Sequence, residues 1–181
     1  MSPISIGLPK VYASAGSNCV PPNDFIIGTW HVTHSSLPQW KGKRNVNITY
    51  KQLPADSAGV QKFEDLIQYQ SIDSEKIKSV HGVETPTPGN PGAWDWCGTG
   101  WLMMASAHWE CLGFGRTDDD NQWIVRYFDK TLFTPAGIDV CSRNKGGIPQ
   151  TTVEQILDAV KRLGVKGITD LADSVFQIPQ N

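Results

Sequence analysis

The stretch FIIGTWHVTHSS, residues 25–36, decides the expected fold. A Pro-Pro pair at positions 21 and 22 marks a turn just before it, and apolar or aromatic residues then alternate with polar ones. Because successive side chains of a β-strand point to opposite faces, Trp30, Val32 and His34 share one face. We therefore predict a strand over 25–36 whose Trp30 ring points toward an interior.

The same alternation recurs along the chain as far as Arg143. It predicts further strands, separated by turns rich in Pro, Gly, Asp and Asn, over 44–53, 60–71, 77–83, two within 93–115, 122–130 and 137–143. About eight short strands at close spacing are typical of an antiparallel barrel or sandwich.

After the strands the apolar period changes to that of a helix. Thr151 and Glu154 have the spacing of a capping box, and apolar residues recur at helical intervals until Gly164. We predict one amphipathic helix over 150–164 that packs on the outside of the sheet. The chain is then a single domain, which divides into an N-terminal extension (1–24), the barrel (25–143), the helix and a C-terminal tail (165–181).

Composition excludes several functional classes. Lys and Arg total 16 against 18 Asp and Glu, and the formal charge of −2 argues against a nucleic-acid partner. No run of apolar residues has the length of a membrane helix or, near the N-terminus, of a signal peptide, so we expect no membrane partner and a cytoplasmic location. The four cysteines are scattered, which predicts free thiols and no zinc site.

Three features, in this order along the chain, resemble the lipocalin and calycin superfamily. They are the Gly28-Thr29-Trp30 motif that opens the first strand, the acidic turn 118–120, and Arg143 after the last strand, followed by a helix. Segments such as TLFTPAGID, residues 131–139, are also similar to lipocalin-like proteins of filamentous fungi. The resemblance implies an up-and-down β-barrel of about eight or more strands. In it Gly28, Trp30 and Arg143 are structural, with the arginine packed over the tryptophan at the closed end.

Seven Trp, six Phe and four Tyr exceed what a core of this size needs, so we expect some rings to face a ligand. The first functional hypothesis is therefore binding of a hydrophobic or aromatic small molecule, similar to a natural product, in the barrel cavity. The candidate ligand-binding residues are His34, Tyr50, Trp101, Met103 and Tyr127. The oligomeric state stays open, with a homodimer among the options.

The second hypothesis is an enzyme, and it comes from the fungal resemblance. That resemblance implies a cofactor-free cyclase or isomerase of the pericyclase type, in a secondary-metabolite pathway, that uses the same pocket. His34, His108 and Glu110 are the candidate catalytic residues, because an imidazole and a carboxylate can exchange protons with a substrate. His108 and Glu110 share one strand face, and which face is interior stays open. Neither a metal nor a cofactor is expected; haem binding is a third, less favoured hypothesis.

Overall fold

A computed structural model describes residues 4–13 and 18–181. Residues 1–3 and 14–17 of the predicted N-terminal extension lie outside the described residues. The described chain forms nine β-strands, three α-helices and three short 3₁₀ helices. In chain order these are η1 (Lys10–Tyr12), α1 (Asn23–Ile26), β1 (Gly28–Ser35), η2 (Pro38–Trp40), β2 (Lys43–Gln52), β3 (Phe63–Ser71), β4 (Lys78–Pro86), β5 (Ala93–Gly98), η3 (Gly100–Leu102), β6 (Ser106–Arg116), β7 (Gln122–Phe128), β8 (Gly137–Ser142), α2 (Gln150–Arg162), α3 (Lys166–Asp173) and β9 (Phe176–Gln177).

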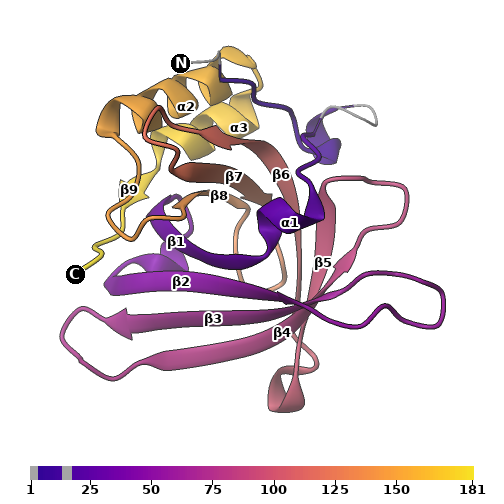
Figure 1. The fold of residues 1–181 in the computed structure, drawn as a ribbon. Helices are drawn as coiled ribbons and strands as arrows, with labels where there is room; N and C mark the ends of the chain where they lie inside the picture. Colours follow the sequence, from indigo (N-terminus) through magenta and orange to yellow (C-terminus); the bar gives the residue numbers. More distant parts are fainter. Residues whose placement is uncertain (1–3, 14–17) are drawn as a thin grey trace.

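Strands β1 to β8 close into an antiparallel barrel (Figure 1). Each strand pairs with the next one along the chain, and β1 pairs with β2 through its first half and with β8 through its second half. Strand β9 adds to the free side of β1 at residues 34 and 35. The predicted up-and-down barrel with a C-terminal helix on its outside is confirmed.

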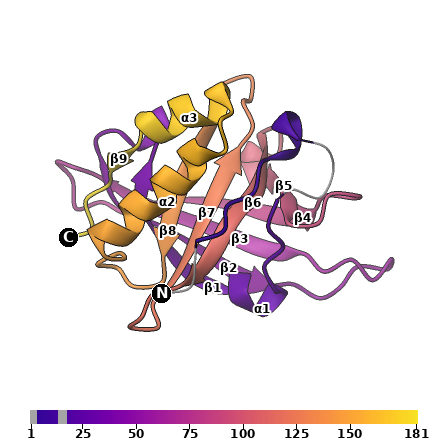
Figure 2. The same ribbon diagram turned by 90° about the horizontal axis from the view of Figure 1, so that it is seen from above.

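The barrel wall separates two apolar clusters. The inner cluster fills the barrel with residues such as Trp30, Ile48 and Trp109. The outer cluster lies between the wall at β6–β8 and the two long helices, where Val140 of β8 meets Ile156 of α2. Figure 2 shows α2 and α3 lying over this side of the barrel. The apolar stripe of the predicted helix is therefore buried against the outer face of the sheet.

The meander gives the barrel two different ends. In such a topology the β1–β2, β3–β4, β5–β6 and β7–β8 loops lie at one end, which we call the open end. The opposite end, called the closed end, holds the start of β1 and the single helical turn α1. Ile26 of α1 is fully buried in the inner cluster, so this turn helps to seal the closed end.

Two local features differ from the sequence prediction. The first strand begins at Gly28 rather than at residue 25, because 23–26 form the helical turn α1. Register shifts interrupt the pairing between Val32 and His34 and between Cys111 and Gly113. Each shift adds one residue to one strand and so reverses the alternation of faces beyond it.

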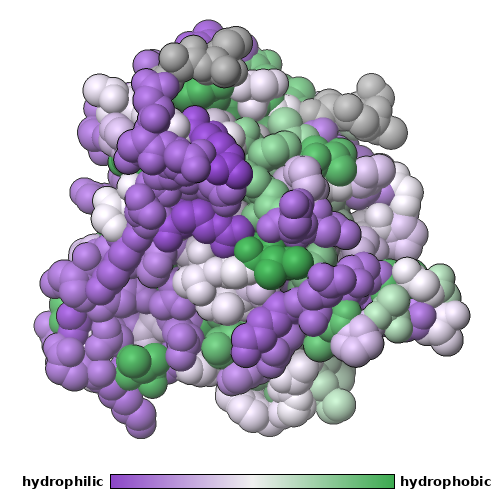
Figure 3. All heavy atoms as spheres, viewed as in Figure 1, coloured by the Kyte–Doolittle hydropathy of each residue, from purple (hydrophilic) through white to green (hydrophobic). Residues whose placement is uncertain are grey.

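Across the described residues, no helix combines the length and the apolar character that a membrane span requires. The face seen in Figure 3 is largely hydrophilic over β2 and β3, and its apolar residues form small groups.

Candidate functional site

A cavity of about 400 Å³ lies inside the barrel toward the open end. Its mouth is formed by parts of three loops at that end: 37–40 between β1 and β2, 104–105 between β5 and β6, and 129–134 between β7 and β8. Its walls are mainly apolar and aromatic, contributed by Leu37, Ile48, Ile67, Leu132 and the rings Trp40, Trp96, Trp109, Phe128 and Phe133. This is the composition of a site for a small organic molecule.

The tryptophans of β5 and β6 are held in place by contacts with one another and with β4. Trp109 stacks on Trp94, with ring centroids 4.4 Å apart and an interplanar angle of 18°. Trp96 lies against β4 over Gly82, where a Cβ atom would come within 2.0 Å of the Trp96 Nε1. Glycine at position 82 is therefore required for this ring to lie flat on the wall.

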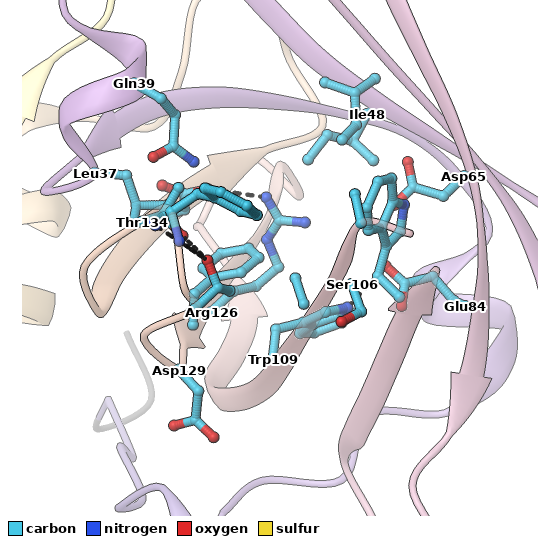
Figure 4. Close-up of a pocket in the computed structure, with 18 of the residues that line it drawn as sticks. Leu37, Gln39, Ile48, Asp65, Glu84, Ser106, Trp109, Arg126, Asp129 and Thr134 are labelled. Atoms are coloured by element: carbon cyan, nitrogen blue, oxygen red, sulfur yellow. Dashed lines mark hydrogen bonds and ion pairs between the residues drawn. The ribbon is translucent and has the colours of Figure 1, made fainter. Parts of the chain in front are cut away.

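A buried arginine projects into the cavity from β7 (Figure 4). Arg126 is 2% exposed; it donates to the Tyr50 hydroxyl at 2.7 Å and to Asp139 Oδ2 at 3.1 Å. Its Cζ lies 5.5 Å from the centroid of the Trp109 ring. The Ser35 hydroxyl donates to the other oxygen of Asp139. Arg126 and Asp139 thus form a buried ion pair whose charges balance one another.

Two further carboxyl groups lie together on the facing wall (Figure 4). Asp65 of β3 pairs with Gly82, and Glu84 lies two residues further along β4 on the same face. Both side chains are 2% exposed. Burial raises the pKa of Asp65 to about 6, although Glu84 and Arg126 lower it. Burial and the nearby charge of Asp65 hold the pKa of Glu84 well above its usual range.

The raised pKa values of both groups favour a state in which the pair holds one proton, with Glu84 as the more readily protonated group. Glu84 Oε1 accepts a hydrogen bond from Trp109 Nε1 at 2.9 Å. A neutral acid beside a carboxylate is an arrangement that can donate one proton and accept another.

His34 does not line the cavity. After the shift in β1, Val32 still pairs with Cys141 of the inner cluster, but His34 pairs with Val140 of the outer cluster. Ser35 takes the inward position instead, where it contacts Asp139. The alternation used to place His34 beside Trp30 thus fails at the bulge, and burial lowers the pKa of His34.

His108 and Glu110 come together, but on the outer face of β6. His108 Nε2 lies 3.5 Å from Glu110 Oε1, and His108 Nδ1 lies 2.7 Å from Asp95 Oδ1. Hydrogen bonds to Glu110 and Asp95 raise the pKa of His108 to about 9, although burial lowers it. Glu110 also accepts from the backbone N–H of Lys10. Since Trp109 occupies the inner face, this ion pair ties the N-terminal segment to the barrel and has no access to the cavity.

The predicted ligand-binding aromatics and methionine take different places. Tyr50 lies in the inner cluster and supports Arg126 from below the cavity. Tyr127 lies in the outer cluster, because its neighbour Arg126 takes the inner face. Trp101 and Met103 are 90% and 66% exposed in the β5–β6 loop and do not line the cavity, whereas the next residue, Met104, does.

The residues expected to be structural meet at the closed end. Arg143 Cζ lies 3.8 Å from the centroid of the buried Trp30 ring. Arg143 donates to the backbone carbonyls of Thr29 at 3.0 Å and Ile27 at 2.7 Å. Gly28 has a φ of 102°, and a Cβ there would lie 3.0 Å from Arg143 Nη1. Glycine therefore allows both the backbone turn and the close approach of the guanidinium group.

Sequence reasoning missed Asp65, Glu84, Arg126 and Asp139. A signal for them was present, since Asp65 has the same strand parity as Phe63 and Ile67, and Arg126 the same parity as Ile124 and Phe128. Within the described residues, no three His, Cys, Asp or Glu side chains are grouped so that they could hold a metal ion.

Comparison with known proteins finds a similar sequence, from a fungal biosynthesis cluster, and several solved structures with a similar fold. No family model matches the chain. It is 27% identical over 165 residues to the botcinic acid biosynthesis cluster B protein 12 of Botryotinia fuckeliana (strain B05.10), an alignment that covers 88% of this chain and 74% of that protein.

Among solved structures, H1 crustacyanin from the lobster Homarus americanus matches with a TM-score of 0.62 and 14% identity, over 99% of this chain and 90% of that one. The amine binding protein of Rhodnius prolixus matches with a TM-score of 0.54 and 12% identity, over 91% and 86% of the two chains. These proteins share the closed eight-stranded barrel with this chain, and at such identities the likeness concerns the fold alone. The chain therefore has a lipocalin-like barrel fold, with the Gly28–Trp30 motif at its closed end.

Proposed function

We propose that this protein binds a small, largely apolar or aromatic molecule inside its barrel. The observation that carries the proposal is the cavity of about 400 Å³ with aromatic walls and buried polar groups at its base. Apolar walls supply affinity through the area that they remove from water, and a few polar groups fix the orientation of the ligand.

A cavity-filling variant tests this function. Ala107 lines the cavity and pairs with Trp96, so Ala107→Trp places an additional large ring in the space. We expect this variant to lose about tenfold or more in affinity for the neutral fluorescent probe N-phenyl-1-naphthylamine. The matched control is Ser79→Trp, which adds the same ring at an exposed position of β4. Equal binding by the two variants would place the probe outside the barrel and contradict the function.

A cofactor-free isomerase or cyclase is the second candidate. It is favoured by the Asp65–Glu84 pair, since one carboxyl group can protonate a carbonyl oxygen while the other removes a proton from carbon. The similarity to a protein of a biosynthesis cluster is compatible with such a role. In this proposal Asp65 and Glu84 replace His34, His108 and Glu110 as proton carriers, because those three do not line the cavity.

Turnover distinguishes a catalyst from a carrier. The purified protein would be added at one-hundredth of the substrate concentration to the precursor that accumulates when its gene is deleted. A catalyst converts many equivalents and Glu84→Gln abolishes the conversion, whereas a carrier converts none.

A further inference from the structure

Among the described residues that line the cavity, acidic side chains outnumber basic ones. Five charged side chains line the cavity: Asp65, Glu84, Arg126, Asp129 and Asp139. Arg126 is the one basic residue among the described lining residues, and Asp139 already pairs with it. The side chain of Asp129 points away from Asp65, Glu84 and Arg126 (Figure 4). The pair formed by Asp65 and Glu84 is left without a counter-ion.

One oxygen atom of each carboxyl group also has no donor partner among the described residues. Asp65 Oδ1 and Glu84 Oε2 are buried, and neither has a hydrogen-bond partner among N–H or O–H groups of the described residues. One proton between the two groups satisfies one pair of oxygens and leaves one negative charge on them. A buried charge without a partner is costly, so a ligand that neutralises it removes part of this cost when it binds.

We propose that the Asp65–Glu84 pair is the recognition site for the ammonium group of an organic cation with an aromatic or other apolar body. This inference rests on the proposed binding function and names the class of ligand. Aromatic rings surround the pair: Trp109 donates to Glu84, and Trp96 of the neighbouring strand pairs with Glu84 across β4 and β5. The faces of such rings attract cations, so the walls and the carboxyl groups favour the same ligand charge.

Anionic and neutral ligands fit this site less well. An anion would enter beside three carboxyl groups, and Nε is the one nitrogen of Arg126 without an acceptor among the described residues, since Nη1 and Nη2 already donate to Tyr50 and Asp139. A neutral alcohol could donate one hydrogen bond to the pair but would leave its charge in place. A protonated amine offers up to three donors and neutralises that charge.

The pH dependence of binding follows from the groups around Asp65. Facing it inside the barrel are Glu84 of β4, Arg126 of β7, Asp139 of β8 and Tyr50 of β2, and His81 acts on it from β4. Burial raises the pKa of Asp65 to about 6, so its negative charge forms as the pH rises through this value. The affinity for an amine that stays protonated therefore increases between about pH 5 and pH 7.5.

Three probes with one common ring system test the proposal. Isothermal titration calorimetry at pH 7.5 would compare 2-(2-naphthyl)ethylamine, 2-(2-naphthyl)ethanol and 2-naphthylacetate. We expect the amine to bind about tenfold or more tighter than the alcohol, and the acetate to bind most weakly. The double variant D65N/E84Q removes the charge and should bring the amine to within about threefold of the alcohol. The control D129N keeps the inner pair intact and should keep the selectivity.

The outcomes separate the general proposal, binding of a small molecule in the barrel, from the specific one, recognition of an ammonium group by Asp65 and Glu84. Binding of the alcohol by the double variant shows that this variant is folded, so its loss of selectivity is then specific to the carboxyl groups. If the alcohol binds as tightly as the amine to the unmodified protein, or if selectivity survives in D65N/E84Q, the charge proposal is wrong while the binding function stands. If none of the three probes binds, both proposals are wrong.

Discussion

Two arginines inside this barrel each lie over a tryptophan ring, yet their surroundings differ. At the closed end, Arg143 lies over Trp30 and donates to backbone carbonyl oxygens and to Gln122, and no carboxylate of residues 4–13 or 18–181 pairs with it. Toward the open end, Arg126 lies over Trp109 and pairs with Asp139, and it faces two carboxyl groups, each with one oxygen that has no donor partner among the described residues.

The difference separates a structural from a ligand-binding role. The donors of Arg143 reach acceptors of the protein itself, on the segments around Gln122 and 25–29, so that network needs no ligand. The network around Arg126 borders the cavity and is incomplete at Asp65 and Glu84. Buried polar groups that a protein leaves unsatisfied are candidates for contact with a ligand.

Arg126→Met should have the largest effect on stability. It leaves the carboxylate of Asp139 buried without its cation, a change that typically costs about 3–5 kcal/mol. Urea denaturation at pH 7 measures this loss. The double variant R126M/D139L removes both charges and should be more stable than R126M alone. A loss below about 1 kcal/mol for R126M would show that water or another group compensates for the pair.

Arg143→Met should destabilise the protein by roughly 3 kcal/mol, because several buried or half-buried acceptors lose a charged donor at once. Arg143→Lys keeps the charge but lacks the planar guanidinium group, so its stability should lie between that of the unmodified protein and that of R143M. Neither variant should alter probe affinity at temperatures where it is folded. A specific loss of probe binding in R143K would remove the distinction between the two arginines.

The Asp65–Glu84 pair should make the ligand-free protein less stable as the pH rises. The pKa of Asp65 is about 6 when folded and near 3.8 when unfolded, so the folded state binds the proton more tightly and stability falls between these values. At 1.36 kcal/mol per pKa unit this amounts to roughly 3 kcal/mol. D65N/E84Q should therefore gain stability relative to the unmodified protein between pH 4 and pH 7.5. A constant difference across this range would contradict the raised pKa.

His108→Gln should have the smallest effect, and the contribution that it removes also declines as the pH rises, at higher pH than for Asp65. The pKa of His108 is about 9 when folded against 6.5 when unfolded, so its contribution is complete below pH 6.5 and is lost as the pH rises through 9. Since His108 is partly exposed, we expect a loss of about 1 kcal/mol at pH 6 and almost none at pH 10. Probe binding should not change, because the residue lies outside the barrel wall.

The sequence predicted the barrel better than its interior. Alternation and turn residues fixed the strands and the outer helix, since these signals are local. The bulge after Val32 could not be predicted from alternation, and it moves His34 to the outer face. Arg126 and Tyr127 are adjacent on β7, so only one of them can point into the barrel. Arg126 does so, and its partner Asp139 lies on another strand, which the local sequence does not reveal. Buried charges in strands have the same pattern as exposed ones until their partners are known.

The most direct test of the central claim is a crystal structure of the protein with 2-(2-naphthyl)ethylamine. We predict the naphthalene ring between Trp96 and Phe128 inside the barrel, with the ammonium nitrogen within hydrogen-bonding distance of Asp65 or Glu84. Density for the amine only among the exposed loop residues, with the barrel interior unoccupied, would contradict the account.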